Sequence, residues 1–303
     1  MMGRAISRVT AAVMSTFNPQ DNLIQNCRAL LEQCSEVVVV DDGSTSPDEA
    51  VYDQLAALGC VVLRLESNMG IAAALNKGVE LARSRNAALE YVLTMDQDSL
   101  VPPGFVHALE DAAAAAAAVG LSVGMVSPGK VSGLPSRPLR THSGVVIGDE
   151  PVQSGLLIPV ASLDKVGQFN EKLFIDGVDS EFYLRAKASK LLCIIAPGAE
   201  LLHSLGAMVP ASIGRWQLKR GRKPLLVRTA ASWRYYFIVR NRVLLARRFA
   251  LQEPYWTMRG LVLDLRHLLL VSLLAPGRHE RLSWARLGLR DGLLGRSGPR
   301  PKP

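Results

Sequence analysis

The chain has 303 residues, among them 35 Lys and Arg, 27 Asp and Glu and four Cys, and its formal net charge is +8 at pH 7. A chain of this length forms one large domain or two smaller ones and can bury a sizeable core. The cysteines show no paired metal-ligand spacing, which indicates a reducing compartment.

The first hundred residues alternate between strand-like and helix-like patterns, as a parallel sheet with crossover helices requires. Apolar runs rich in β-branched residues predict strands at residues 9–16, 37–40, 60–65 and 91–95. Apolar residues at helical spacing predict helices around residues 23–34, 48–58 and 70–84. We therefore expect an α/β fold with a mainly parallel, Rossmann-like sheet flanked by helices.

Beyond residue 100 the predicted elements are less regular. An Ala-rich run predicts a helix at residues 105–119. Strands are predicted at residues 125–128, 142–147 and 152–158, with a bend at Gln153-Ser154-Gly155 in the last of them. Another helix is expected to begin near Asp176 and to continue through Arg185. After Met208 the periodicity becomes helical and the composition basic, so we place a domain boundary near residue 210.

The two parts of the chain carry opposite charge. Residues 1–210 hold 15 Lys and Arg against 23 Asp and Glu, whereas residues 211–303 hold 20 against 4. The second part, a basic helical region rich in Leu and Trp, is predicted to associate with an anionic membrane surface rather than with nucleic acid. Its segment 233–242 is aromatic and cationic and suits a membrane interface, with ordinary helix packing as the alternative. Residues 261–275 fall short of the roughly 20 apolar residues of a bilayer span, and residues 9–14 are too few for a secretory signal.

Each of the first four predicted strands ends in polar residues. In open parallel sheets, ligands bind outside the carboxyl ends of the strands, so these residues are expected to line one pocket. No Gly-x-Gly-x-x-Gly follows the first strand and no Gly-Lys-Ser/Thr loop is present, which argues against the usual dinucleotide and P-loop sites. The polar strand ends are Ser15, Thr16 and Asn18, then Asp41 and Asp42, then Ser67 and Asn68, and finally Asp96 and Asp98.

Three acidic or imidazole-bearing motifs are suited to chemistry at that pocket. Asp96 and Asp98 can both reach one hard cation through oxygen ligands, although an exposed polar turn is the simpler alternative. A second acidic cluster, residues 176–181, lies at a predicted helix start, where Asp179 can face the pocket and act as a general base. His203 follows an apolar, strand-like run and is suited to a cation or a diphosphate.

Together these motifs resemble the inverting family 2 glycosyltransferases of the GT-A fold, and more narrowly their bacterial rhamnosyltransferase branch. The resemblance covers residues 9–206 in order and spacing, and the combination is far more specific than its parts. The matching pieces are Thr16-Phe17-Asn18-Pro19, Val39-Val40-Asp41-Asp42-Gly43-Ser44, Asn68-Met69-Gly70-Ile71-Ala72, Asn76-Lys77-Gly78, Asp96-Gln97-Asp98-Ser99, Ile175-Asp176-Gly177-Val178-Asp179-Ser180-Glu181 and His203-Ser204-Leu205-Gly206.

The resemblance implies a role for each matching residue. A divalent metal, magnesium or manganese, would be held by Asp96 and Asp98 against the donor diphosphate, with His203 completing its shell or touching the phosphates. Asp179 would take the proton from the acceptor hydroxyl. The nucleotide would be bordered by Thr16, Asn18, Asp41, Asp42, Asn68, Gly70, Asn76 and Asp96, with Asp42 at the base or ribose.

The resemblance also implies the reaction and its place in the cell. L-Rhamnose would move from dTDP-L-rhamnose to a saccharide acceptor linked to polyprenyl diphosphate, at the cytoplasmic face of the plasma membrane, in cell-surface polysaccharide synthesis. Phe17 and Asp41-Asp42 replace the Tyr and Asp-Asn that are commoner in the branch, so UDP-hexose and galactofuranose donors stay open. A nucleotidylyltransferase would need a Gly-rich, Arg-bearing loop after the first strand. An inactive scaffold is a further alternative, and the acidic residues retained in these motifs argue against it.

Overall fold

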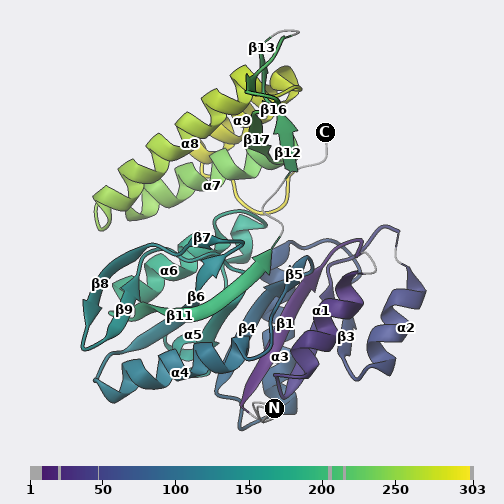
Figure 1. Ribbon diagram of the computed structural model, residues 1–303, viewed down its shortest axis with the longest axis vertical. Coiled ribbons are helices and arrows are strands. Elements are labelled where there is room, and N and C mark those ends of the chain that lie inside the picture. Colours follow the sequence, from purple (N-terminus) through teal and green to yellow (C-terminus); the bar gives the residue numbers. More distant parts are fainter. Residues whose placement is uncertain (1–8, 20–21, 47, 204–206, 214–215, 301–303) are drawn as a thin grey trace. The chain divides into compact units, whose positions relative to one another are not determined.

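The computed structural model describes residues 9–19, 22–46, 48–203, 207–213 and 216–300 (Figure 1). The chain divides into two compact units. The N-terminal unit comprises the described residues of 1–171 and 178–204, and the C-terminal unit those of 172–177 and 205–303. The boundary predicted near residue 210 thus lies a few residues past this division, and no pattern in the sequence predicts that residues 172–177 group with the C-terminal unit.

The first half of the N-terminal unit alternates strands and helices in the predicted order. Its elements are β1 (Thr10–Thr16), α1 (Asn22–Leu31), β2 (Glu36–Asp41), α2 (Glu49–Ala57), β3 (Val61–Arg64), α3 (Ile71–Arg85) and β4 (Tyr91–Asp96). The four strands pair in parallel in the order β3-β2-β1-β4. Val37 to Val40 are fully buried, because helices cover both faces of such a sheet. The predicted α/β fold with flanking helices is confirmed.

The second half of this unit extends the same sheet. Its elements are β5 (Ser99–Leu100), α4 (Phe105–Ala118), β6 (Val123–Val131), β7 (Leu134–Pro135), β8 (Pro138–His142), β9 (Val145–Gly148), β10 (Leu156–Pro159), α5 (Val160–Val166), η1 (Glu171–Leu173), α6 (Val178–Ala188) and β11 (Leu192–His203). From β4 the order continues β10-β6-β11-β9-β8. Strand β10 runs antiparallel to β4 and β6, whereas β11 is parallel to β6.

One predicted strand in this half is wrong. Residues 142–147 were expected to form a single strand, but the chain reverses between β8 and β9. Ser143 and Gly144 take φ angles of 47° and 83°, the left-handed conformation of a two-residue hairpin turn. The strand predicted at residues 152–158 begins only at Leu156, because Gly155 has φ 76° at the predicted bend.

The C-terminal unit starts with short strands and ends with three helices. Strands β12 (Ala207–Pro210) and β17 (Leu226–Thr229) pair, as do β13 (Ser212–Ile213) with β14 (Trp216–Gln217) and β15 (Lys219–Arg220) with β16 (Lys223–Pro224). The helices are α7 (Arg234–Phe249), α8 (Pro254–Leu274) and α9 (Arg278–Leu293). The helical expectation is therefore wrong for residues 207–213 and 216–229, where Pro210, Pro224 and a turn at Gly221 with φ 64° oppose a helix.

The helices of this unit pack through the aromatic part of α7. Tyr235 and Tyr236 are buried, and the Tyr236 hydroxyl donates to Asp291 Oδ2 of α9 at 3.0 Å. A Cβ atom at Gly288 would lie 2.3 Å from the Tyr236 carbonyl oxygen, so a glycine lets α9 approach α7. The interface interpretation of residues 233–242 is accordingly wrong for the side chains buried here, and the packing alternative holds. No helix within the described ranges is both long and apolar enough to cross a bilayer.

Candidate functional site

The carboxyl ends of β1, β2 and β4 meet at one edge of the sheet. Thr16 pairs with Asp41 of β2, and Ser15 pairs with Asp96 of β4. Because the three strands are adjacent and parallel, this register brings Thr16, Asp41 and Asp96 together, as expected from the polar strand ends. Thr16 is buried, and its hydroxyl donates to the Val40 carbonyl oxygen at 3.3 Å.

Asn18 connects the loop after β1 to the loop after β2. Its Oδ1 accepts the backbone N–H of Thr45 at 3.0 Å and of Ser46 at 3.3 Å, and its own N–H donates to Ser44 Oγ at 2.7 Å. Asn18 takes φ 47°, a conformation that Asn tolerates better than most residues. These bonds hold Asn18 against the loop that follows β2.

Asp41 and Asp42 hold the loops beside the sheet edge. Asp41 Oδ1 accepts the Ser44 N–H at 3.1 Å, while the Oδ1 and Oδ2 atoms of Asp42 accept the N–H groups of Met69 at 2.7 Å and Gly70 at 2.9 Å. Burial raises the pKa of Asp42 to about 6, with a smaller contribution from the neighbouring Asp41, and the two N–H groups act in the opposite direction. By accepting the N–H groups of Met69 and Gly70, Asp42 fixes the start of α3.

The remaining predicted nucleotide contacts differ in their surroundings. Asn68 is exposed, and Gly70 is buried at φ 93° directly before α3. Asn76 is buried, and its amide bonds residues near η1: Nδ2 donates to the Phe169 carbonyl oxygen at 2.9 Å and to Glu171 Oε1 at 2.8 Å, and Oδ1 accepts the Phe169 N–H at 2.9 Å. These bonds give Asn76 a structural role, and its contact with a nucleotide stays a prediction.

Asp96 is the last residue of β4, and Asp98 lies in the turn between β4 and β5. The Asp96 N–H donates to Ser154 Oγ at 3.1 Å, and Ser99 Oγ lies 2.6 Å from the same atom. Between the two acids, Gln97 Oε1 accepts the Phe17 N–H at 2.8 Å, which joins this turn to the loop after β1. The turn that carries the two carboxylates is therefore hydrogen-bonded to Ser154 and to the loop after β1.

Sequence reasoning missed Gln97 and Ser154 as parts of this site. Gln97 stands between the two acids without a predicted role of its own, and Ser154 is predicted only as part of a bend. Asn26 of α1 also contributes, because its Nδ2 donates to the Gln97 carbonyl oxygen at 2.8 Å. Their partners lie far away in the sequence, so only the position of Gln97 within Asp-Gln-Asp offered a signal.

His203 is placed beside the acidic turn by strand pairing. It is the last residue of β11, and its backbone pairs with Ser99, the residue after Asp98. Its side chain lies outside the described part of the structure. Among the side chains that the structure describes, no group of three or more His, Cys, Asp or Glu could hold a metal. Two carboxylates nevertheless fit Mg²⁺ or Mn²⁺, since such ions often bind one or two carboxylates and complete their shell with water and substrate phosphates.

Asp179 is the second residue of α6 and lies in its first turn, where the helix dipole favours a negative charge. One carboxylate oxygen, Oδ1, accepts the Ser180 N–H at 2.8 Å. Glu181, the other acid of this turn, is buried and forms an ion pair with Arg185 at 2.7 Å. Because Glu181 is buried in this ion pair, it is not suited to the role of general base that is expected of Asp179.

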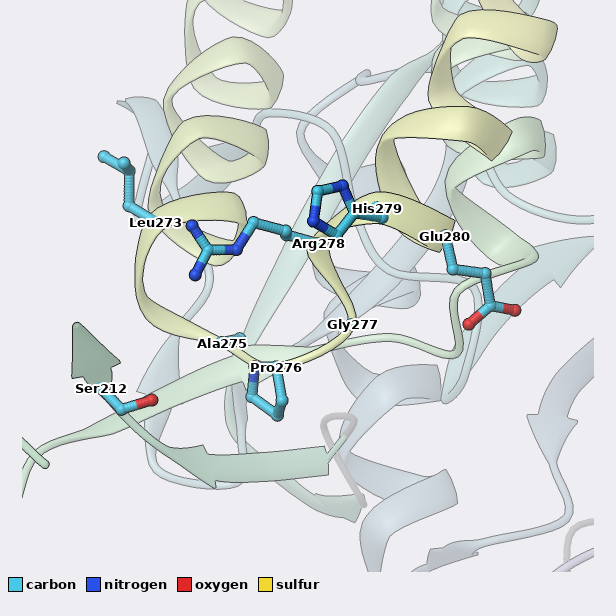
Figure 2. A pocket seen from close by; sticks show the side chains of 8 residues that line it. All are labelled: Ser212, Leu273, Ala275, Pro276, Gly277, Arg278, His279 and Glu280. Atoms are coloured by element: carbon cyan, nitrogen blue, oxygen red, sulfur yellow. The ribbon is translucent and has the colours of Figure 1, made fainter. Parts of the chain in front are cut away.

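A pocket of about 530 Å³ lies in the C-terminal unit, and its lining residues are far from these strand ends in the sequence. It is lined by Ser212 of β13, Leu273 of α8 and residues 275–280, which comprise the connection from α8 and the first turn of α9. Figure 2 shows that the side chains of Arg278, His279 and Glu280 point in different directions and do not converge on one ligand position. The candidate site is therefore the edge of the sheet and not this pocket.

This sheet, with paired acids at the tip of its fourth strand, has the GT-A fold of nucleotide-sugar-dependent glycosyltransferases. TarS of S. aureus is similar with a TM-score of 0.57 and 17% identity, over 94% of this chain and 48% of that one. Its 1–349 form in complex with UDP-GlcNAc gives 0.52 and 16%, over 95% and 92%. GalNAc-T7 with UDP, GalNAc and Mn²⁺ gives 0.52 and 14%, over 64% and 43%, so the chain spans under half of the longer TarS chain and of the GalNAc-T7 chain.

The sequence comparisons identify the family. Residues 11–153 match the model of glycosyl transferase family 2. The dTDP-rhamnosyl transferase RfbF of Shigella flexneri is 27% identical to this chain, over 95% of this chain and 96% of its own length. Residues 11–153 thus match a family 2 glycosyltransferase domain, and the protein is a glycosyltransferase.

Proposed function

We propose that the protein transfers L-rhamnose from dTDP-L-rhamnose to a lipid-linked saccharide, with inversion at the anomeric carbon. The donor assignment rests on the likeness to the dTDP-rhamnosyl transferase RfbF over nearly the whole of both chains. The observation that carries the reaction class is the register that brings Thr16, Asp41 and Asp96 to one sheet edge, with Asp98 in the adjoining turn.

In this proposal the loops after β1 and β2 bind the nucleoside. Thr16 and Asn18 line one side of the site, and Asp41 and Asp42 lie on the other. Asp42 receives two backbone N–H groups and retains lone pairs for a base or ribose donor. Asn68 and Gly70 border the nucleotide from the loop that Asp42 holds in place.

The donor diphosphate is assigned to the turn of Asp96 and Asp98. These two carboxylates would hold a divalent cation, with His203 beside them in the strand register. Such a cation, when bound, offsets the negative charge that develops on the departing diphosphate. The bonds from Asp96 to Ser154 and from Gln97 to Phe17 orient the turn before the donor arrives.

The proposed chemical step is a single displacement with Asp179 as the general base. The acceptor hydroxyl oxygen forms a bond to the anomeric carbon while the bond from that carbon to the diphosphate oxygen breaks. The hydroxyl proton passes to the Asp179 carboxylate, and dTDP leaves as an anion. One displacement inverts the anomeric configuration, and general-base catalysis of this kind contributes about 10² to 10⁴ in rate.

The experiment that tests the function compares donors directly. Full-length protein is incubated with dTDP-L-rhamnose, a UDP-hexose or UDP-galactofuranose, each with Mn²⁺ or with EDTA, and the released nucleoside diphosphate is measured. We expect release from dTDP-L-rhamnose with Mn²⁺ and a loss of it with EDTA. Preferential release of UDP would overturn the donor assignment, and no release from any donor would overturn the function itself.

We further propose that the C-terminal unit attaches peripherally to the cytoplasmic leaflet, where a lipid-linked acceptor is presented. Six large apolar side chains recur at helical spacing on α8 and are each 54–68% exposed: Tyr255, Met258, Val262, Leu265, Leu269 and Leu273. Residues 211–303 hold 20 Lys and Arg against 4 Asp and Glu. An exposed apolar helix face in a basic region supports adsorption to an anionic bilayer.

A further inference from the structure

Residues 172–177 form a short, strained segment that groups with the C-terminal unit, although the N-terminal unit supplies the residues on both sides of it. Phe174, Asp176 and Gly177 have φ angles of 67°, 63° and 81°. The left-handed conformation is unfavourable for residues with a side chain, so a segment with two of them needs contacts that hold it. The chain passes directly from Gly177 into α6, whose second residue is Asp179.

Asn241 of α7 supplies the main contact. Its side chain is buried, and Nδ2 lies 2.9 Å from the carbonyl oxygen of Leu173 and 2.7 Å from those of both Ile175 and Asp176. The two hydrogens of one amide group thus serve three carbonyls of the segment, so one hydrogen is shared between two of them. Arg240, also buried, adds a bond from Nη2 to the Leu173 carbonyl oxygen at 2.9 Å. Loss of such a donor to a buried carbonyl destabilises the folded conformation of the segment.

The same face of α7 contacts the rest of the segment. Arg234 donates from Nη2 to Asp176 Oδ1 at 2.5 Å and from Nε to Asp176 Oδ2 at 3.2 Å, a two-point pairing that fixes orientation. The Phe237 ring stacks on the Phe174 ring with 5.0 Å between centroids. Residues 234, 237, 241 and 245 recur at the spacing of one helical face, and Leu245 packs against Gly177.

We propose that Asn241 and Arg234 are positioning residues for sugar transfer. They hold residues 173–177 in the left-handed conformation from which the first turn of α6, with Asp179, continues. This inference rests on the proposed role of Asp179 as general base. It makes the C-terminal unit necessary for the chemical step itself, in addition to any role in membrane attachment.

The test measures kcat and KM for hydrolysis of the nucleotide-sugar that the wild-type, full-length protein turns over fastest, with water as the acceptor. For Asn241→Leu, which keeps the branched shape and the number of side-chain heavy atoms and removes the donors, we expect kcat to fall about 30- to 100-fold, because a displacement of about 1 Å has that effect. The dissociation constant of dTDP, measured by calorimetry, should stay within about twofold, since the nucleotide residues are untouched. Hydrogen exchange should rise in peptides that cover residues 173–180.

Substitution of Arg234, whose side chain is half-buried, gives a second test that does not depend on the folding of Asn241→Leu. Arg234→Gln should lower kcat about tenfold, and Arg234→Lys, which keeps the charge opposite Asp176, should recover most of that loss. The matched control is Arg242→Gln, which removes an ion pair of α7 with Asp264 but no contact to residues 172–177 that the structure describes. Its kcat should stay within about twofold of wild type.

The two proposals fail in different ways. If the wild-type protein turns over its donor and both Asn241→Leu and Arg234→Gln match it in kcat, this inference is overturned and the proposed function stands. A fall in kcat that Arg242→Gln shows equally would also overturn it, because the loss would then reflect general damage to the C-terminal unit. If the wild-type protein hydrolyses no nucleotide-sugar, the proposed function fails, and the inference fails with it.

Discussion

Asp179 occupies a helix position that suits a base, with one carboxylate oxygen bonded to the Ser180 N–H and the helix dipole favouring its charged form. Asp179→Asn keeps the shape and removes the ability to accept a proton. We expect turnover to fall by about 10²- to 10⁴-fold while dTDP binding stays within about twofold. Nucleotide release and calorimetry measure the two quantities.

The matched control for that substitution is Asp164→Asn in α5, which removes an exposed carboxylate that pairs with Arg83 at 2.8 Å. Exposed pairs of this kind contribute little to stability, so this variant should behave as wild type. Unchanged turnover in Asp179→Asn would remove Asp179 from the role of base.

Asp42 predicts a pH dependence of stability. Burial raises its pKa from 3.8 to about 6, so the folded state binds this proton more tightly than the unfolded chain does. The stabilisation is fully present below pH 3.8 and is lost as the pH rises through 6. Relative to Asp42→Asn, which does not titrate, the free energy of unfolding of the wild type should fall by about 2 to 3 kcal/mol between about pH 3.5 and pH 7. Urea unfolding at each pH measures this difference, and parallel pH curves would contradict it.

Residue positions were predictable from the sequence where a strand end determined them. Thr16, Asp41 and Asp96 follow apolar runs, and parallel pairing then brings them to one edge. The bonds of Asn76 to Phe169 and of Gln97 to Phe17 join residues far apart in the chain, and no local pattern reports such partners. The sequence therefore predicted which acids gather at this edge of the sheet and missed the polar side chains that hold them.

At the scale of elements, α3 packs closely on the sheet through Gly78. A Cβ atom at this position would lie 2.3 Å from Val13 Cγ1 of β1 and 3.0 Å from Val40 Cγ2 of β2. Gly78→Ala should lower the free energy of unfolding by about 1 to 3 kcal/mol, because overpacking forces side chains off their rotamers. Urea denaturation measures the change.

Gly198→Ala in β11 is the control for Gly78→Ala, since a Cβ atom at residue 198 would meet nothing within 4 Å. Its effect should stay within about 0.5 kcal/mol. The double variant Gly78→Ala with Val13→Ala should lose less stability than the sum of the single variants, because the clash is removed. Strict additivity would show that α3 does not press on Val13.

Elements with a strong period were predictable and elements that depend on turn geometry were not. The buried apolar runs of β1, β2 and β4 and the Ala-rich segments of α3 and α4 agree with the structure. The hairpin at Ser143-Gly144 and the short strands of residues 207–229 break a pattern that looked continuous. A single pair of residues with positive φ reverses a strand without changing its apolar character.

At the scale of the whole molecule, the sequence revealed an acidic first part and a basic second part. It suggested residues 233–242 as a segment at a membrane interface, but Tyr235 and Tyr236 there are buried, whereas α8 carries six exposed large apolar side chains at helical spacing. The grouping of residues 172–177 with the C-terminal unit also escaped prediction, because it depends on Asn241 and Arg234 more than fifty positions later.

The exposed face of α8 predicts the residues of membrane attachment. The double variant Val262→Glu with Leu265→Glu places two negative charges on this face and should lower partition onto liposomes that contain anionic lipid by at least about tenfold. Leu139→Glu, an exposed apolar position of β8, is the control and should float as wild type does. Equal flotation of the double variant and wild type would contradict attachment through α8.

The most direct test of the account is the position of the cation relative to the donor. Crystals of the full-length protein are soaked with dTDP and Mn²⁺, and the anomalous signal of manganese is measured. We predict one manganese peak bounded by the carboxylates of Asp96 and Asp98 and by the diphosphate oxygens. Bound dTDP whose diphosphate lies away from these two carboxylates, with no manganese between them, would contradict the account.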